Sequence, residues 1–158
     1  MPSVVLTKSL ILDHLKAHKL MSIATYGDHP WIATVYYSFD EELHLYFLSS
    51  PDTLHAKHIA QNPHVAVSIA DSAQKPSAEK VGLQLHGIVE QLGKTELIRH
   101  ALRHWKDSLS IQDPTLTYEN MVKSIVKGRM YKITPKKIKF FNESLFDVEV
   151  GHEPILTF

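Results

Sequence analysis

The segment SSPDTLHAK, residues 49–57, has the residue types of an anion-binding site at the start of a helix. A helix N-terminus presents free N–H groups and about half a positive charge. Thr53 and Lys57 are one helical turn apart and share a face, and His55 adds an imidazole beside them. Hydroxyl, imidazole and ammonium groups around free amides suit a phosphate. The plain alternative is that Ser50 only caps the helix and Lys57 is only solvated.

Histidine is abundant, at 11 residues, and two pairs have a spacing that can chelate a metal. His14 with His18, and His100 with His104, are four residues apart on expected helices. Neither pair has the glutamate of H-E-x-x-H, so we interpret them as solvated helix-face residues and predict no metal site. Haem ligation by a histidine stays open as an alternative. The turn and strand-edge histidines, interpreted as solvated in the same way, are His29, His44, His64 and His152.

Other catalytic signatures are absent from the sequence. It has no G-x-S-x-G nucleophile elbow, no Walker loop and no G-x-G-x-x-G fingerprint. Cysteine is absent, which excludes disulfides, thiolate zinc sites and a cysteine nucleophile. The basic residues between Lys123 and Lys139 alternate with apolar ones, which is typical of a solvated strand face. With 17 basic and 17 acidic residues the formal net charge is zero, which argues against a nucleic-acid binder.

Length and composition predict one globular domain over residues 1–158. Hydrophobic residues make up 44% and charged residues 22%, which excludes a disordered or fibrous chain. No apolar run approaches the roughly 20 residues of a membrane span, and the first ten residues do not resemble a signal peptide. We therefore expect a cytoplasmic protein that does not bind membranes.

The hydrophobic periodicity changes several times along the chain and predicts a mainly β fold with peripheral helices. Alternating or β-branched segments predict strands, and 3.6-residue spacing predicts helices. The expected strands are residues 20–25, 31–39 (buried), 43–48, 64–70, 81–92, 129–133 and 137–141. The expected helices are residues 7–18, 50–61, 94–105 and 118–126, the first capped by Thr7 and the second ended by Asn62-Pro63.

Short turns between the first three strands predict an antiparallel meander, and a polar, mobile loop is expected over residues 71–80. Gly82 and Gly87 lie inside one strand, which indicates a bulge or a close approach of backbone or ligand. Residues 134–136 are expected to form a turn between the last two strands, and the tail from Asn142 is weakly specified. Six or seven strands of this kind favour a small antiparallel β-barrel.

The order of these motifs resembles the flavin-binding split-barrel family related to pyridoxamine 5′-phosphate oxidase. The resemblance covers residues 7–93 and rests on LMSIAT, WIATVYYSFDEELHLYFLSS, TLHAKHIAQNPHVAVSIA and GLQLHGIVEQL. The helix ending in N-P-x-V is its most specific mark. Within the family, T-x-H-A and KIKFFNESL are more similar to an uncharacterised bacterial branch than to the oxidase itself.

The resemblance implies a six- to seven-stranded split barrel that forms a homodimer and binds FMN at the subunit interface. The four residues that would run beside the flavin are Ala33, Thr34, Val35 and Tyr36. Ser49 and Ser50 would approach its phosphate end, and the family's phosphate-binding S-x-K falls on Thr53-Leu54-His55. His55 replaces the lysine, Lys57 lies half a turn further on, and the family's strand arginine has no counterpart in residues 31–33.

By the same resemblance, the implied activity is that of an FMN-dependent oxidoreductase using NAD(P)H and a small-molecule substrate. Gln84 and His86 lie on a strand near the implied flavin and are weak candidates for contact with it. No residue stands out as a necessary acid or base. The C-terminal arginine and histidine that hold the vitamin B6 phosphate in the oxidase have no match, so oxidation of that vitamin is not expected. The alternative is a non-catalytic carrier of flavin or haem with the same fold.

Overall fold

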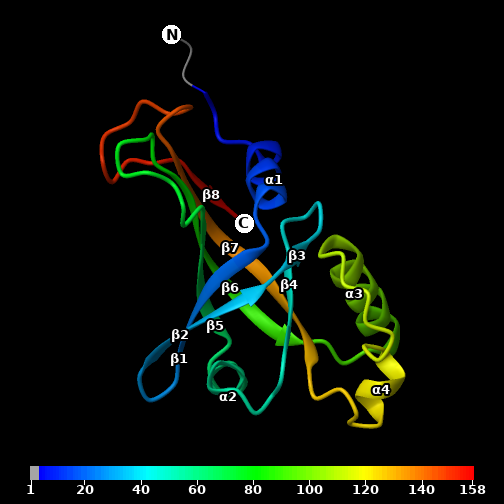
Figure 1. Ribbon diagram of the computed structural model, residues 1–158. Helices are drawn as coiled ribbons and strands as arrows, with labels where there is room; N and C mark the ends of the chain where they lie inside the picture. Colours follow the sequence, from blue (N-terminus) through cyan, green and yellow to red (C-terminus); the bar gives the residue numbers. More distant parts are fainter. Residues whose placement is uncertain (1–3) are drawn as a thin grey trace.

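The computed structural model describes residues 4–158. Short helices lie around one curled sheet (Figure 1). The elements, in chain order, are α1 (Lys8–Ala17), β1 (Leu20–Tyr26), β2 (Pro30–Tyr36), β3 (Ser38–Phe39), β4 (Leu45–Ser49), α2 (Leu54–Gln61), β5 (His64–Ala70), β6 (Val81–Gln91), α3 (Thr95–Ser108), α4 (Tyr118–Val122), β7 (Arg129–Asn142) and β8 (Ile155–Thr157). No helix within the described residues has the length and apolar character needed to cross a membrane.

All pairings in the sheet are antiparallel, and the strand order is β2-β1-β5-β6-β7-β4-β3, with β8 added to β7. The sheet curls so far that β2, at one edge, lies in contact with β4 near the other. The predicted antiparallel split barrel with peripheral helices is therefore confirmed. Residues 4–158 contain eight strands, one more than the upper expected number. The separate β3 and the unanticipated β8 add two strands, and the joining of the last two expected strands into β7 removes one.

Alternation along β1 and β5 gives this part of the sheet a buried inner face and a more exposed outer face. In β5, Val65, Val67 and Ile69 are buried, and the residues between them are exposed. Phe47 of β4 and Tyr131 of β7 also face inward, and their rings stack inside the main core with centroids 5.1 Å apart. Helix α1 closes one end of this core, and its predicted N-cap is confirmed, since Thr7 Oγ1 accepts a hydrogen bond from Leu10 N at 3.3 Å.

Two expectations for the strands between residues 20 and 48 were wrong. Residues 31–39 do not form one buried strand: β2 ends at Tyr36, and it is an edge strand on which Ile32 is 65% exposed. The expected meander is also broken there, because among the described strands β2 pairs only with β1, while β3 pairs with β4. The two hairpins thus belong to opposite edges of the curled sheet, which a pattern of local turns does not reveal.

The expected turn at residues 134–136 is instead a bulge inside one long strand, β7. The pairing with β6 shifts register between His86 and Gly87, so that Lys137 faces His86 while Pro135 faces Gly87. Proline is tolerated in a strand at such irregularities because its missing N–H is not needed for the ladder. A side chain at residue 87 would place its Cβ 2.8 Å from the carbonyl oxygen of Thr134. The predicted special role of Gly87 is thereby confirmed as a close backbone approach.

Candidate functional site

Three of the predicted phosphate residues meet where β4 ends and α2 begins. Ser49 is the last residue of β4 and is buried, Thr53 caps α2, and His55 lies in its first turn. His55 Nε2 is 2.8 Å from Ser49 Oγ and 3.3 Å from Thr53 Oγ1. We call these three side chains the Ser–Thr–His cluster. It joins two hydroxyls and an imidazole at a helix N-terminus, where anions are favoured.

A short turn before α2 sets the position of the cluster. Helix α2 begins at Leu54 and not near Pro51, because Thr53, and not Ser50, is the N-cap. Thr53 N bonds Ser50 O at 3.1 Å, and Thr53 Oγ1 donates to the same carbonyl at 2.8 Å. Ser50 Oγ accepts from Asp52 N at 3.3 Å and is not part of the cluster's contacts. Lys57 is exposed and also lies outside the cluster.

The pKa of His55 is lowered by its burial. A free imidazole titrates near about 6.5, so in the ligand-free protein His55 is mainly neutral at pH 7. A neutral imidazole can still donate one hydrogen bond to a phosphate oxygen. A phosphate dianion bound at the cluster would therefore need a permanent positive charge from another residue.

Arg129 is a candidate for that charge, because arginine stays protonated in proteins, and the sequence alone did not point to it. It is the first residue of β7, and the register places it directly opposite Ser49 on β4. Residues directly opposite in an antiparallel pair point to the same face of the sheet. Among residues 4–158 its hydrogen bonds all use Nη1, which contacts the carbonyls of Val126 and Gly128 at 3.0 and 2.8 Å and that of Lys127 at 3.3 Å. The other guanidinium nitrogens, Nε and Nη2, could therefore donate hydrogen bonds to an anion.

A second candidate region is a hollow of about 510 Å³ on the outer face of the sheet. Its floor is made of small side chains, because the register aligns Ser22 with Ser68 and Ala24 with Ala66. The remaining lining residues are Ile32, Val67, Gln84, Leu85, His86, Lys137, Lys139 and Ile155. The structure thus brings the two predicted residues of β6, Gln84 and His86, into one ligand-sized hollow.

Most of the charged and hydrogen-bonding side chains of the hollow lie along one rim, formed by β6 and β7. Lys137 faces His86 and Lys139 faces Gln84 across the β6–β7 pair. The ring of His86 is stacked on that of His64, with centroids 5.3 Å apart and planes 11° from parallel. The rim therefore presents two lysines and an exposed imidazole pair beside a floor of small side chains.

The four predicted residues of β2 are divided between two faces. Ala33 and Val35 are half-buried and pack against the main core. Thr34 and Tyr36 are exposed and share the face of Ile32, which lines the hollow. A ligand on the outer face of the sheet would meet only Thr34 and Tyr36 of these four.

Acid should destabilise the fold through its buried histidines. Burial lowers the pKa of His14, whose Nε2 is 2.8 Å from the carbonyl oxygen of Ile69, and nearby His18 lowers it further. Because the folded-state pKa lies below the unfolded value of about 6.5, the unfolded chain binds more protons. We expect the free energy of unfolding to be highest above pH 6.5 and to fall as pH drops through the folded pKa values of His14 and His55.

Urea unfolding between pH 5 and 8 measures this dependence. His14→Gln keeps an amide donor for Ile69 but cannot titrate, so it should flatten the pH profile. The matched control is His152→Gln, since His152 is a highly exposed side chain. An unchanged profile in His14→Gln would contradict the assignment to His14.

Comparison with known proteins identifies the fold and the family. The family model described as pyridoxamine 5′-phosphate oxidase matches residues 8–142. A search of curated proteins gives no match. Many solved structures do match, and three illustrate the range of ligands in their names.

The three structures share the fold at low sequence identity. A putative pyridoxamine 5′-phosphate oxidase from Listeria innocua has a TM-score of 0.66 at 20% identity, covering 85% of this chain and 97% of that one. An FAD-binding protein from Mesorhizobium loti has a TM-score of 0.65 at 18% identity, covering 84% and 90%. The haem storage protein HutZ from Vibrio cholerae has a TM-score of 0.66 at 12% identity, covering 87% and 95%.

At these identities the structural likeness establishes the split-barrel fold and not the ligand. The family match is stronger, because it spans most of the sequence, including β1 to β7, the Ser–Thr–His cluster and every lining residue of the hollow except Ile155. The chain belongs to the pyridoxamine 5′-phosphate oxidase family.

Proposed function

We propose that this protein is a homodimeric FMN-binding protein and that the Ser–Thr–His cluster, together with Arg129, holds the phosphate. The observation that carries the proposal is the convergence of Ser49 and Thr53 hydroxyls on His55 at the N-terminus of α2. Arg129 adds the permanent positive charge that a phosphate dianion requires. Hydroxyls, a helix N-terminus and an arginine fit a phosphate monoester, and the family match supports a flavin as its carrier.

The proposed activity is an FMN-dependent oxidoreductase that uses NAD(P)H and a small-molecule substrate. When bound, FMN supplies the hydride chemistry, and the protein supplies binding and orientation. Thr34 and Tyr36 on the exposed face of β2 are placed to orient a planar ligand, and Gln84 and His86 offer hydrogen bonds from the hollow. The C-terminal arginine and histidine that hold the vitamin B6 phosphate in the oxidase have no match in this chain. We therefore do not propose pyridoxamine phosphate as the substrate.

Haem carriage is the second candidate, and one feature favours it. The stacked pair of His64 and His86 lies at a largely apolar hollow, and an imidazole there can serve as an axial haem ligand. Lys137 and Lys139 on the same rim can pair with the haem propionates. The haem-storage neighbour shares the fold and so supports the same candidate.

Titration of the purified protein with FMN, riboflavin and haemin separates these candidates. We expect FMN to bind at least about tenfold more tightly than riboflavin, because hydrogen bonds to a charged group contribute roughly 1.5–3 kcal/mol. Equal affinities for the two flavins would contradict the phosphate site. A haemin complex with a Soret band that is lost in His86→Ala, without any flavin binding, would favour the carrier.

A further inference from the structure

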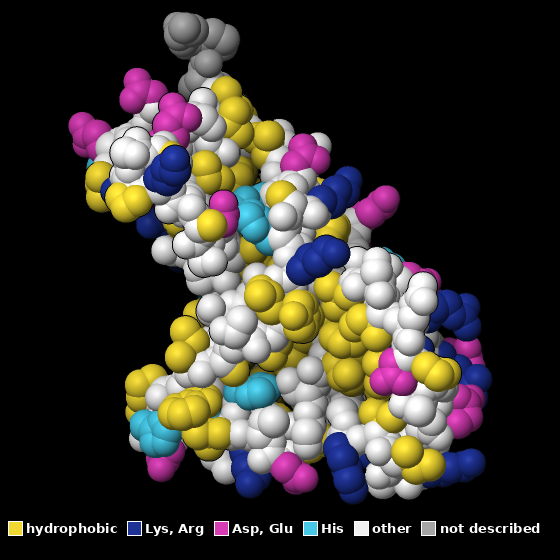
Figure 2. Space-filling model, in the orientation of Figure 1, with side chains coloured by type: hydrophobic (Ala, Val, Ile, Leu, Met, Phe, Trp, Pro, Cys, Tyr) yellow, Lys and Arg dark blue, Asp and Glu magenta, His cyan; other side chains and the backbone are white. Residues whose placement is uncertain are grey.

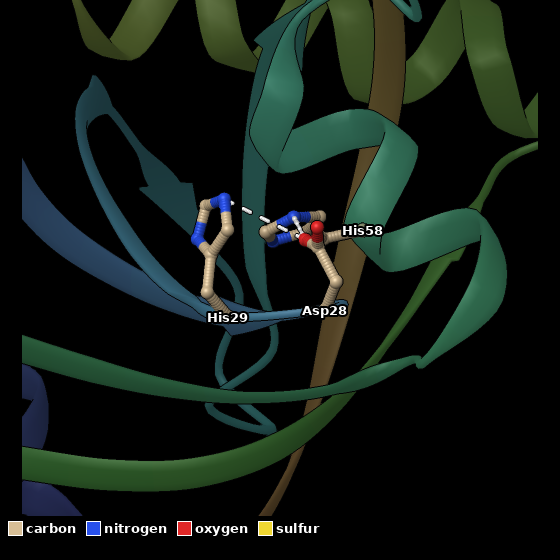
Figure 3. A group of neighbouring side chains, drawn as sticks. All are labelled: Asp28, His29 and His58. Atoms are coloured by element: carbon tan, nitrogen blue, oxygen red, sulfur yellow. Dashed lines mark ion pairs between the residues drawn. The ribbon is translucent and has the colours of Figure 1, made fainter.

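We propose that Asp28, His29 and His58 form a binding site for a divalent transition metal ion, with Zn²⁺ as the best-suited ion. Figure 3 shows the three side chains converging, Asp28 and His29 from the β1–β2 turn and His58 from α2. This site does not depend on flavin or haem binding. The sequence pattern did not predict it, because the ligands come from segments about 30 residues apart and lack a helical metal motif.

The distances suit a metal that draws the three ligands slightly inward. Asp28 Oδ1 is 3.5 Å from His29 Nε2 and 3.9 Å from His58 Nε2. All three ligand atoms lie within 4.8 Å of one another. Zinc bonds of about 2.0–2.2 Å in tetrahedral geometry place neighbouring ligand atoms about 3.4 Å apart. Asp28 and His29 are exposed, at 86% and 50% of the side chain, and can make this small closure without disturbing the core.

Hydrogen bonds on the far side of both imidazoles prepare Nε2 as the ligand atom. His58 Nδ1 is 3.0 Å from Thr25 Oγ1, and His29 Nδ1 is 3.0 Å from the carbonyl oxygen of Pro30. Pro30 O can only accept, so His29 carries its proton on Nδ1, and Thr25 Oγ1 can likewise accept a hydrogen bond from His58 Nδ1. The lone pairs then lie on both Nε2 atoms, which face Asp28. Such outer contacts orient the histidine ligands of metal sites in general.

The strongest single observation is the isolation of His58 Nε2. His58 is 4% exposed, yet its Nε2 atom has no hydrogen-bond partner among residues 4–158. A buried polar atom without a partner destabilises the fold unless something satisfies it. The turn approaches closely enough that a Cβ at Gly27 would lie 2.7 Å from this atom. A metal ion held by His58, His29 and Asp28 would satisfy the buried nitrogen.

The ligand set also indicates the class of ion. Two imidazoles and one carboxylate are borderline ligands that suit Zn²⁺ and other first-row metals better than Ca²⁺ or Mg²⁺. Three protein ligands leave a fourth coordination position for water or a substrate atom. The proposed site therefore has the composition of a zinc site with one open position.

Zinc binding to the metal-free protein tests the proposal. Competition against a chromophoric chelator should give one tightly bound Zn²⁺ per chain, and Co²⁺ should give the visible absorption of a low-coordinate site. Asp28→Asn and His29→Asn change exposed residues, so we expect them to fold and to lose at least about tenfold in Zn²⁺ affinity. Thr25→Val keeps the shape of a buried side chain and should lower the affinity by about 10- to 100-fold through His58.

Two control variants make the result specific. His152→Asn removes an exposed histidine that lies 3.6 Å from Glu149, a similar pair without a buried third ligand. His86→Asn removes one member of the other close histidine pair. Neither should change Zn²⁺ affinity at the tight site. The proposal is overturned if no tight Zn²⁺ is found, if His29→Asn binds like the wild type, or if only His86→Asn removes the bound metal.

Discussion

Arg129→Gln should weaken FMN binding by about 10- to 150-fold and leave riboflavin binding unchanged. The range corresponds to roughly 1.5–3 kcal/mol, the contribution of hydrogen bonds to a charged group. The effect should be this large because Arg129 carries a permanent charge in the proposed site, whereas burial lowers the pKa of His55. Fluorescence titration of both flavins against wild type and variant measures the difference.

The control for this prediction lies two residues away. Lys127 is an exposed cation near the same end of β7, and Lys127→Gln should change FMN affinity little. Arg129 also binds the carbonyls of residues 126–128, so Arg129→Lys serves as a second variant that keeps the charge. It should recover part of the FMN affinity while losing the two-pronged geometry. If both Arg129 variants bind FMN like the wild type, the phosphate does not lie beside β7.

The sequence predicted well those features that arise from neighbouring residues. The strict alternation of residues 64–70 predicted β5 with its bounds, and Asn62-Pro63 ended α2 where expected. The closeness of the three residues of the Ser–Thr–His cluster could also be expected from the sequence, since they lie within a segment of seven residues. Such features depend on local periodicity and on turn chemistry, both of which a single sequence displays.

The features that the sequence did not predict depend on pairings over long distances in the chain. Arg129 meets Ser49 only through the register of β4 with β7, and His58 meets Asp28 only through the packing of α2 against the β1–β2 hairpin. The sequence predicts a turn at Pro135 because proline is rare inside strands, and only the partner strand shows that pairing continues. Composition and spacing carry no signal for such contacts.

The outer face at β2 is the surface on which we place the proposed dimer contact. Across the β1–β2 pair, Leu20 faces Tyr36 and Ala24 faces Ile32, so exposed apolar side chains form one patch. Leu20, Ile32 and Tyr36 are 47%, 65% and 54% exposed. An unpaired edge strand with an apolar face is a site for association. Figure 2 shows further hydrophobic side chains, with a histidine among them, gathered over the end of the same hairpin at the lower left.

Ile32→Asp should therefore convert a dimer of twice 18.0 kDa into a monomer at micromolar concentration. In a twofold interface the substitution occurs in both copies, and each uncompensated buried charge costs about 3–5 kcal/mol. We expect the dimer dissociation constant to rise at least about 100-fold in sedimentation equilibrium.

The matched control is Val122→Asp, because Val122 on α4 is also 65% exposed but lies outside the patch. A monomeric wild type, or an Ile32→Asp variant that dimerises as tightly as Val122→Asp, would place the interface elsewhere or exclude it. If FMN binds between the two copies, as proposed, Ile32→Asp should lose flavin affinity together with dimerisation, while Val122→Asp keeps both.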